Sequence, residues 1–163
     1  MIKKTLSRAA TLLACAVFSF PSFAKGAPTE PRMNELTCLA TAIYFEARGE
    51  PKAGRLVVGQ VILNRVAHER YPSSVCGVVY QNANRRNACQ FSFACDNIPD
   101  NISDPAVFAE IKMEAGLLLS CTADCPASEM STSTHYHAVS ASPDWSTKLR
   151  KIGRLGRHVF YET

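Results

Sequence analysis

Beyond residue 24 the sequence has no apolar run of about 20 residues, the length that a membrane-spanning helix needs. It also has no internal repeat, no low-complexity segment and no Cys-x-x-Cys pair of the kind found in common structural zinc sites. These absences argue against a membrane-embedded protein, a repeat architecture and a zinc-stapled fold. What remains is a chain of mixed composition, long enough for one domain with a hydrophobic core.

The first 24 residues have the pattern of a secretory signal peptide. Three basic residues precede an apolar stretch at residues 9–20, and Ser22-Phe23-Ala24 forms a small-x-small cleavage signal. A lipoprotein signal ending at Cys15 is the alternative, but Cys15 lies in the middle of the apolar stretch instead of at its end. We therefore expect residues 1–24 to be removed on export and residues 25–33 to form a linker.

Removal of the signal peptide leaves little net charge. The full chain has 18 Lys+Arg and 14 Asp+Glu, and three of the basic residues lie within residues 1–24, which leaves a net charge of +1. A nucleic-acid partner is therefore not expected. The remaining local basic segment is either a solvated loop or a contact for an anionic polymer such as a cell wall with peptide carboxylates; it contains Lys148, Arg150, Lys151, Arg154 and Arg157.

Six of the seven cysteines lie beyond the signal peptide. An even number in an exported chain indicates disulfides, because the compartments outside the cytoplasm are oxidising. The short separations between Cys89 and Cys95 and between Cys121 and Cys125 suit local loops better than zinc ligation. Of the pairings that six cysteines allow, we expect Cys38–Cys76, Cys89–Cys95 and Cys121–Cys125.

The spacing of apolar residues predicts a mostly helical α+β domain. Three helices are expected from about residue 32 to Gly49, from Pro51 to His68, and from Ser73 or Ser74 to Tyr80. A fourth helix is expected to begin at a cap at Ser103. Its inward-facing residues are expected to be Phe108, Ile111, Leu117 and Leu118. Two β-like runs, residues 134–139 and 158–161, are expected to pair as a small hairpin.

Glu46 is the residue around which the first expected helix is organised. Counting back by helical spacing places it on one stripe with Leu36, Leu39 and Ile43, which are all apolar. Gly49 ends the helix, so Glu46 lies in the last turn, near the negative end of the helix dipole. Burial and the dipole both disfavour the charged carboxylate and raise its pKa, which suits a general acid. The alternative is a boundary glutamate paired with Arg48 or Arg65.

Six segments of the chain resemble the SleB/CwlJ family of cell wall hydrolases. They are IYFEARGEP at 43–51, VILNRV at 61–66, YPSSVCGVVYQ at 71–81, CQFSF at 89–93, THYHA at 134–138, and IG at 152–153 followed by HVFY at 158–161. The resemblance implies a lysozyme-like catalytic domain at residues 34–163 that cleaves the glycan strand of peptidoglycan, with Glu46 as the catalytic glutamate.

Two departures from the spore enzymes of that family affect the expected localisation. The chain lacks the N-terminal peptidoglycan-binding repeats that spore-cortex members often carry, and its cysteines are not a feature of spore proteins. A role in periplasmic wall remodelling in a Gram-negative cell therefore fits better than spore germination or an extracellular location. We expect a monomer that binds peptidoglycan, needs no cofactor and does not insert stably into a membrane once the signal peptide is removed.

Cleavage of a glycosidic bond usually requires two carboxylates, about 5 to 9.5 Å apart. Only Glu46 is well placed, because Glu50 lies past the helix stop and Asp96 lies in a separate loop. A single glutamate suffices if the muramyl 6-hydroxyl attacks its own anomeric carbon while the glutamate acts first as acid and then as base. This lytic transglycosylase route is preferred to plain hydrolysis by a muramidase or glucosaminidase.

The pattern His135-Tyr136-His137 supports a rival function, because alternate residues of a strand face the same side, as zinc ligands do in some wall endopeptidases. A third ligand is not evident at a supporting spacing. A third class of function is a disulfide-stapled wall-binding protein without turnover. Within the glycosidase interpretation, the expected substrate-binding residues are Gln90, Ser92, Asp96, His135, Tyr136, His137 and Trp145, whereas Phe91 is expected in the core.

Overall fold

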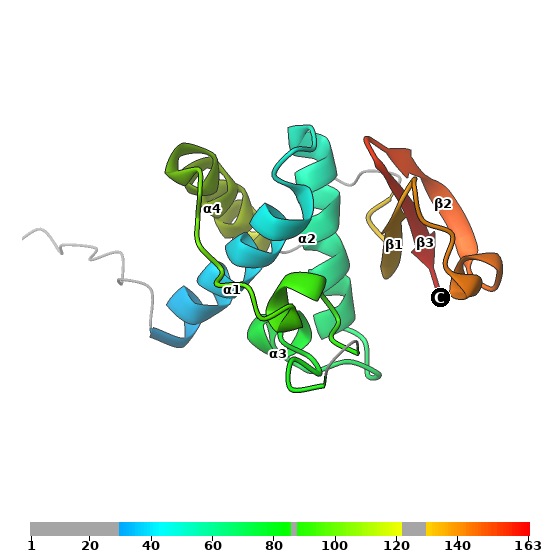
Figure 1. Cartoon of the computed structure of the whole chain (residues 1–163), viewed down its shortest axis with the longest axis horizontal. Helices are drawn as coiled ribbons and strands as arrows, with labels where there is room; N and C mark the ends of the chain where they lie inside the picture. Colours follow the sequence, from blue (N-terminus) through cyan, green and yellow to red (C-terminus); the bar gives the residue numbers. More distant parts are fainter. Residues whose placement is uncertain (1–29, 86–87, 122–129) are drawn as a thin grey trace, which may run out of the picture.

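The computed structural model describes residues 30–85, 88–121 and 130–163. The expected signal peptide at 1–24 and Cys125 lie outside these ranges. Helices form the larger half of the domain and a small sheet the other half (Figure 1). In chain order the elements are α1 (Glu30–Ala47), α2 (Lys52–Val66), α3 (Val75–Val79), the 3-10 helix η1 (Ser92–Cys95), α4 (Pro105–Ser120), β1 (His135–Ala138), the 3-10 helix η2 (Asp144–Thr147), β2 (Arg150–Leu155) and β3 (His158–Glu162).

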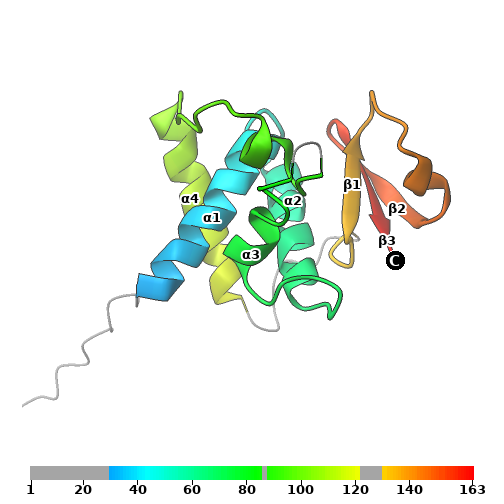
Figure 2. The same cartoon turned by 60° about the horizontal axis from the view of Figure 1, so that its bottom comes forward.

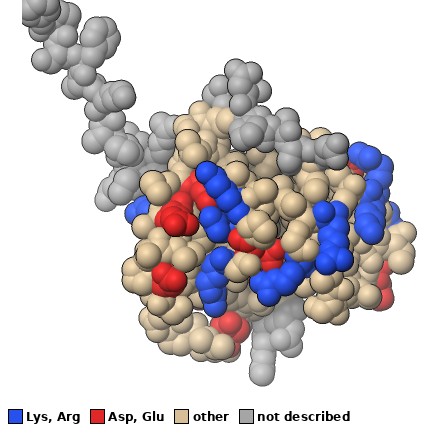
Figure 3. Space-filling view, turned by 90° about the horizontal axis from the view of Figure 1, so that it is seen from above, with Lys and Arg blue, Asp and Glu red and all other residues tan. Residues whose placement is uncertain are grey.

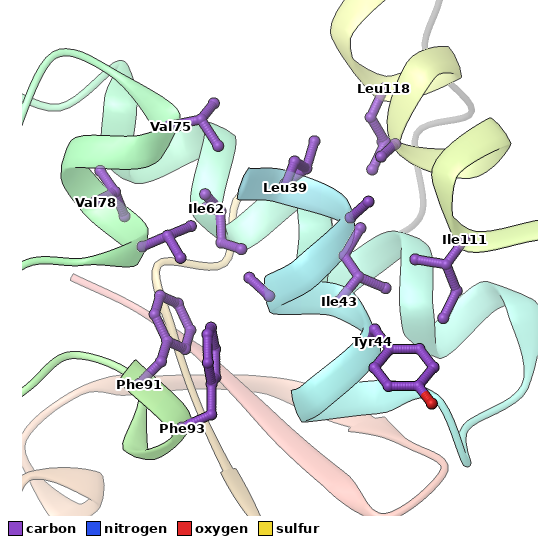
Figure 4. Close-up of a cluster of buried hydrophobic side chains, with 14 residues drawn as sticks. Leu39, Ile43, Tyr44, Ile62, Val75, Val78, Phe91, Phe93, Ile111 and Leu118 are labelled. Carbon is purple, nitrogen blue, oxygen red and sulfur yellow. The ribbon is translucent and has the colours of Figure 1, made fainter. Parts of the chain in front are cut away.

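Helix α1 is the centre of the helical half, because it packs against α2, α3 and α4. Its side chains Leu39, Ile43 and Tyr44 are fully buried (Figure 4), and each buried side chain of this size stabilises the fold by about 1.5–3 kcal/mol. Gly59 lets α2 approach this core closely: a Cβ there would lie 2.5 Å from Leu118 Cδ1 and 2.8 Å from Ile43 Cδ1.

The predicted helices are present, with three corrections. Helix α1 begins at Glu30, inside the segment 25–33 that was expected to form a linker. Ser74 caps α3 as expected, since its hydroxyl accepts the Gly77 N–H. The cap of α4 is Asp104 and not Ser103, because the Asp104 carboxylate accepts the Val107 N–H while Ser103 hydrogen-bonds the Tyr44 hydroxyl. Leu117 was expected to face inward but is 61% exposed.

The sheet contains the predicted pair of strands and one more. Strands β1 and β3 pair antiparallel, with Tyr136 opposite Phe160 and Ala138 opposite His158. Strand β2 pairs with the other edge of β3, which gives the order β1-β3-β2. The residues of β2 belong to the predicted basic segment, and their charges obscured the strand. Arg150 in β2 forms an ion pair with Glu162 in β3.

The sheet lies on the α2 side of the helices, with β1 facing them (Figure 2). Phe160 of β3 is fully buried against Val57, Val58 and Val61 of α2, which anchors the sheet to the helical half. None of the helices within the described ranges is long and apolar enough to cross a membrane.

Two of the expected disulfides are present. Cys38–Cys76 joins α1 to α3, with a Cα–Cα distance of 5.2 Å, and Cys89–Cys95 closes the segment that contains η1, with a distance of 6.2 Å. The third expected pairing, Cys121–Cys125, involves a residue outside the described ranges.

Candidate active site

Glu46 lies in the last turn of α1 and opens into a cavity of about 220 Å³ between the helices and the sheet. The other lining residues come from four separate segments of the chain: Arg65, Gln90, Phe91, Ser92, Tyr136, His137, Ala138 and His158. Among these lining residues Glu46 is the only acid. The cavity therefore presents one carboxylate, surrounded by hydrogen-bonding and aromatic groups.

Burial raises the pKa of Glu46 above its usual value. A hydrogen bond from the Tyr136 hydroxyl, at 3.1 Å, and the positive charge of Arg65 oppose this rise without cancelling it. The direction agrees with the expectation from the sequence. A carboxyl group with a raised pKa keeps its proton closer to neutral pH, as a general acid must.

The two arginines proposed as structural partners of Glu46 are engaged elsewhere. Arg48 lies over the Tyr44 ring, 5.0 Å from its centroid. Arg65 donates from Nε to the Thr134 carbonyl at 2.8 Å, and its guanidinium lies over the Tyr71 and Phe91 rings. Among the described residues, Glu46 has no ion pair within 4.0 Å. The geometry therefore differs from that of a boundary glutamate held by an ion pair.

Two further cavities adjoin this one through shared lining residues. One, of about 400 Å³, shares Gln90 and Ser92 and also includes Asp96. The other, of about 340 Å³, shares Glu46, Ala138 and His158 and extends to Glu50 and Arg157. We call the three adjoining cavities the groove. Glu46 lies along its course instead of at an end, which suits a polymeric ligand.

The expected binding residues divide between two sites. Gln90, Ser92, Tyr136 and His137 border the cavity of Glu46, and Asp96 borders the adjoining one. His135 and Trp145 line none of the groove cavities and instead pack together, with ring centroids 5.3 Å apart. Phe91 is 3% exposed and belongs to the core as well as to the cavity wall.

Alternation along β1 explains the positions of Tyr136 and His135. Tyr136 faces the helices, together with its strand partner Phe160, whereas His135 packs against Trp145. His137 packs against Tyr161 and also borders the cavity of Glu46. His137 Nδ1 donates to the Ala138 carbonyl at 2.8 Å, so its Nε2 accepts from the Tyr161 hydroxyl at 3.0 Å. Both nitrogens of His137 are therefore occupied, which does not favour the zinc endopeptidase. Within the described ranges there is also no group of three or more His, Cys, Asp or Glu that could hold a metal ion.

His135 makes stability depend on pH in a defined direction. Burial, with the charges of Arg65 and Arg70, lowers the pKa of His135 to about 4, whereas an unfolded histidine has a pKa of about 6.5. Between these values the unfolded chain binds the proton and the folded chain does not, so stability falls as the pH is lowered. We expect His135→Gln to flatten this decline, measured as urea midpoints at pH 7, 5.5 and 4.5.

A decline of equal steepness in wild type and His135→Gln would contradict this prediction. Part of the decline should remain in the variant, because burial also lowers the pKa of His158.

Sequence reasoning missed the role of two residues that line the cavity. Arg65 shares a helical stripe with Val58, Val61 and Ile62, and a lone arginine on such a stripe was a usable signal. No local pattern in the sequence points to His158, because only the strand register places it beside Tyr136, with ring centroids 5.1 Å apart. Arg65 Nη1 and His158 Nδ1 are buried and have no hydrogen-bond partner within the described part of the chain.

A partly buried carboxyl group with a raised pKa in an elongated groove is suited to act as the general acid of a glycosidase. The model of the cell wall hydrolase family matches residues 49–161, and the chain belongs to this family. The family resemblance inferred from the sequence is thereby confirmed. The matched segment begins just after Glu46, so the role of that residue is argued from the geometry of the site.

Similar proteins include spore cortex-lytic enzymes. The one from Bacillus subtilis (strain 168) is 28% identical over 131 residues, which are 79% of this chain and 38% of that enzyme. One from Bacillus cereus is 41% identical over 54 residues, 33% of this chain and 21% of the enzyme. The chain thus corresponds to much less than two thirds of the length of these relatives.

Two solved structures share the fold. The catalytic domain of the Bacillus cereus SleB protein matches with a TM-score of 0.60 and 24% identity, over 83% of this chain and 94% of that one. The catalytic domain of the germination-specific lytic transglycosylase SleB from Bacillus anthracis matches with a TM-score of 0.59 and 24% identity, over 83% and 100%. The predicted mostly helical α+β fold class is confirmed, with a three-stranded sheet in place of the expected hairpin.

Proposed function

We propose that this protein is a lytic transglycosylase that cleaves the glycan strands of peptidoglycan, with Glu46 as the catalytic acid and base. The observation that carries the proposal is that Glu46 is the only acid among the described residues that line the cavity of about 220 Å³, and that burial raises its pKa. A second carboxylate in the same cavity would favour ordinary hydrolysis. Glu50 does not serve as one, because both of its oxygens accept hydrogen bonds from Arg157.

The reaction needs one proton carrier. Glu46 donates its proton to the glycosidic oxygen as the bond from that oxygen to the muramyl anomeric carbon breaks. The 6-hydroxyl of the same sugar then forms a bond to the anomeric carbon and gives its proton to the Glu46 carboxylate. The products are a 1,6-anhydro end and a free hydroxyl, and Glu46 returns to its starting state.

The groove offers hydrogen-bonding groups on both sides of Glu46. Gln90 and Ser92 border it on one side, and Arg65 and His158 line the same cavity. These four residues, together with Tyr136, are the proposed contacts of the sugars next to the cleaved bond.

A cell wall hydrolase meets its substrate outside the cytoplasm, so the protein is exported. We place it in the periplasm and propose that it acts as a monomer on peptidoglycan. The signal-peptide pattern at residues 1–24 supports export.

Mass spectrometry of soluble products from purified sacculi tests the proposed function. We expect disaccharide-containing fragments with anhydro ends. Reducing muramic or glucosamine ends would instead establish hydrolysis. Cleaved peptides on intact glycan would favour an endopeptidase, and the absence of any product would favour a wall-binding protein.

Replacement of Tyr136 by phenylalanine tests the hydrogen bond to Glu46. That bond lowers the pKa of Glu46, so its loss should raise the pKa further and move the high-pH limb of the kcat profile to higher pH. We also expect kcat to fall by about tenfold, in line with a hydrogen bond to a charged group. The measurement is product release between pH 5 and 9.

Tyr161→Phe is the matched control, because it removes a hydroxyl on the opposite face of the sheet, where its partner is His137. An unchanged pH profile in Tyr136→Phe would show that the hydrogen bond does not tune Glu46.

A further inference from the structure

Two turns far apart in the sequence meet at one end of the groove. The carboxylate of Glu50, in the α1–α2 turn, accepts the backbone N–H of Arg157 at 2.9 Å and its Nε–H at 2.8 Å. Gly156, in the β2–β3 turn, has φ of +58°, and a Cβ there would lie 1.9 Å from Glu50 Oε2 and 3.4 Å from Pro51 Cδ. The two turns are therefore in direct contact around Gly156.

Three basic side chains surround this junction on its solvent side. Arg154 donates from Nε to the Gly156 carbonyl at 3.2 Å, Lys52 is exposed next to Pro51, and the Arg157 side chain is 71% exposed. The side chain of Glu50 is only 2% exposed. The acid of the junction thus faces inward while Lys52, Arg154 and Arg157, which we call the basic cluster, face solvent. Figure 3 views the molecule from the side on which the β2–β3 turn lies in Figure 1, and Lys and Arg side chains are prominent there, with Asp and Glu side chains among them.

The basic cluster is continuous with the groove. Arg157 lines the same cavity as Glu46, together with Ala138 and His158. Arg157 is also held in place, because Glu50 fixes its Nε and leaves the rest of the guanidinium toward solvent. A guanidinium fixed in this way is suited to bind a carboxylate. A ligand that passes Glu46 along the groove therefore brings its appended groups to the basic cluster.

We propose that the basic cluster of Lys52, Arg154 and Arg157 binds the carboxylates of the peptide stems attached to the glycan strand. The inference rests on the proposed function, since peptidoglycan is the polymer in the groove. Its muramyl sugars carry peptide stems with several carboxylates, whereas the sugar backbone is otherwise mostly neutral. The protein accordingly prefers glycan that still bears its stems to glycan from which an amidase has removed them.

The test measures binding in the Glu46→Gln background, where the substrate should stay intact. Cosedimentation gives the Kd for intact sacculi and for amidase-treated glycan, which keeps one lactyl carboxylate on each muramyl sugar but no peptide. We expect the double substitution Lys52→Gln, Arg154→Gln to weaken binding to sacculi by about three- to tenfold at low salt. The loss should shrink at high salt, and binding to amidase-treated glycan should not change.

Lys112→Gln is the matched control for Lys52→Gln. It removes a lysine from α4 and should leave both Kd values unchanged. Melting temperatures check that the variants are folded. Equal weakening on both substrates would show that the cluster binds the lactyl carboxylate, and no weakening on either would show that it binds neither; both results overturn the inference. If the protein with Glu46 intact releases no glycan fragments while the stem-dependent binding persists, the proposed function fails and the stem site stands.

Discussion

Glu46→Gln is expected to lower turnover on sacculi by about 10⁴-fold or more while binding persists. Glutamine keeps the size of the side chain and can still accept the Tyr136 hydrogen bond, but it can neither donate nor take up the catalytic proton. General acid–base catalysis contributes about 10² to 10⁴-fold, and one carboxylate that serves both steps should reach the upper end of that range. Product release and cosedimentation with sacculi measure the two properties.

The same substitution should increase stability at neutral pH. A carboxyl group whose folded pKa is raised binds its proton more tightly in the folded state, so its contribution is most favourable at low pH and is lost as the pH rises through the folded value. Glutamine does not titrate, so the Glu46→Gln protein does not lose stability in this way as the pH rises. Glu69→Gln, at an exposed position after α2, is the control for a general effect of losing one negative charge. A Glu46→Gln protein that remains active but melts earlier would identify Glu46 as a structural residue.

The part of the site that could be predicted from the sequence is the part carried by one helix. Glu46 shares a stripe with three apolar residues and precedes a glycine, and both signals are local. The partners of Glu46 are not local. Tyr136 lies 90 residues away and reaches Glu46 only because β1 presents that face to the helices. An alternating pattern reveals which residues share a face of a strand, but not which face is inside.

The contrast between local signals and long-range contacts also explains which of the other predictions held and which failed. Two of the expected disulfides are present, and the short loop between Cys89 and Cys95 made that pairing the simpler one to foresee. Strand β2 was missed because its charged residues resemble a solvated loop, and the ion pair of Arg150 with Glu162 in β3 cannot be read from local spacing. Asp104 displaced Ser103 as the cap of α4 because Ser103 is used by Tyr44, a contact across 59 residues.

The largest expected loss of stability comes from Glu50→Ala, at about 2 to 4 kcal/mol. The substitution leaves the backbone N–H of Arg157 without its acceptor and removes the ion pair between the two turns. The exposed Arg157 charge can be solvated, which keeps the loss below that of a fully buried pair. Urea denaturation with two independent probes gives the free energy of unfolding. Activity should fall as well, because the sheet that carries Tyr136 loses its tie to the turn after Glu46.

Glu50→Gln removes the negative charge of this side chain but keeps its size, so comparison with Glu50→Ala separates the two contributions to stability. Glutamine fills the same slot and keeps one acceptor oxygen, so it should lose less stability than alanine and retain far more activity than Glu46→Gln. Burial alone would raise the pKa of Glu50, but the hydrogen bonds from Arg157 outweigh it and hold the pKa below its usual value. Its stabilisation is therefore present above the unfolded pKa of about 4.3 and lost as the pH falls through the lower folded value. A Glu50→Ala protein as stable as the wild type at pH 7 would show that the contact between Glu50 and Arg157 does not stabilise the fold.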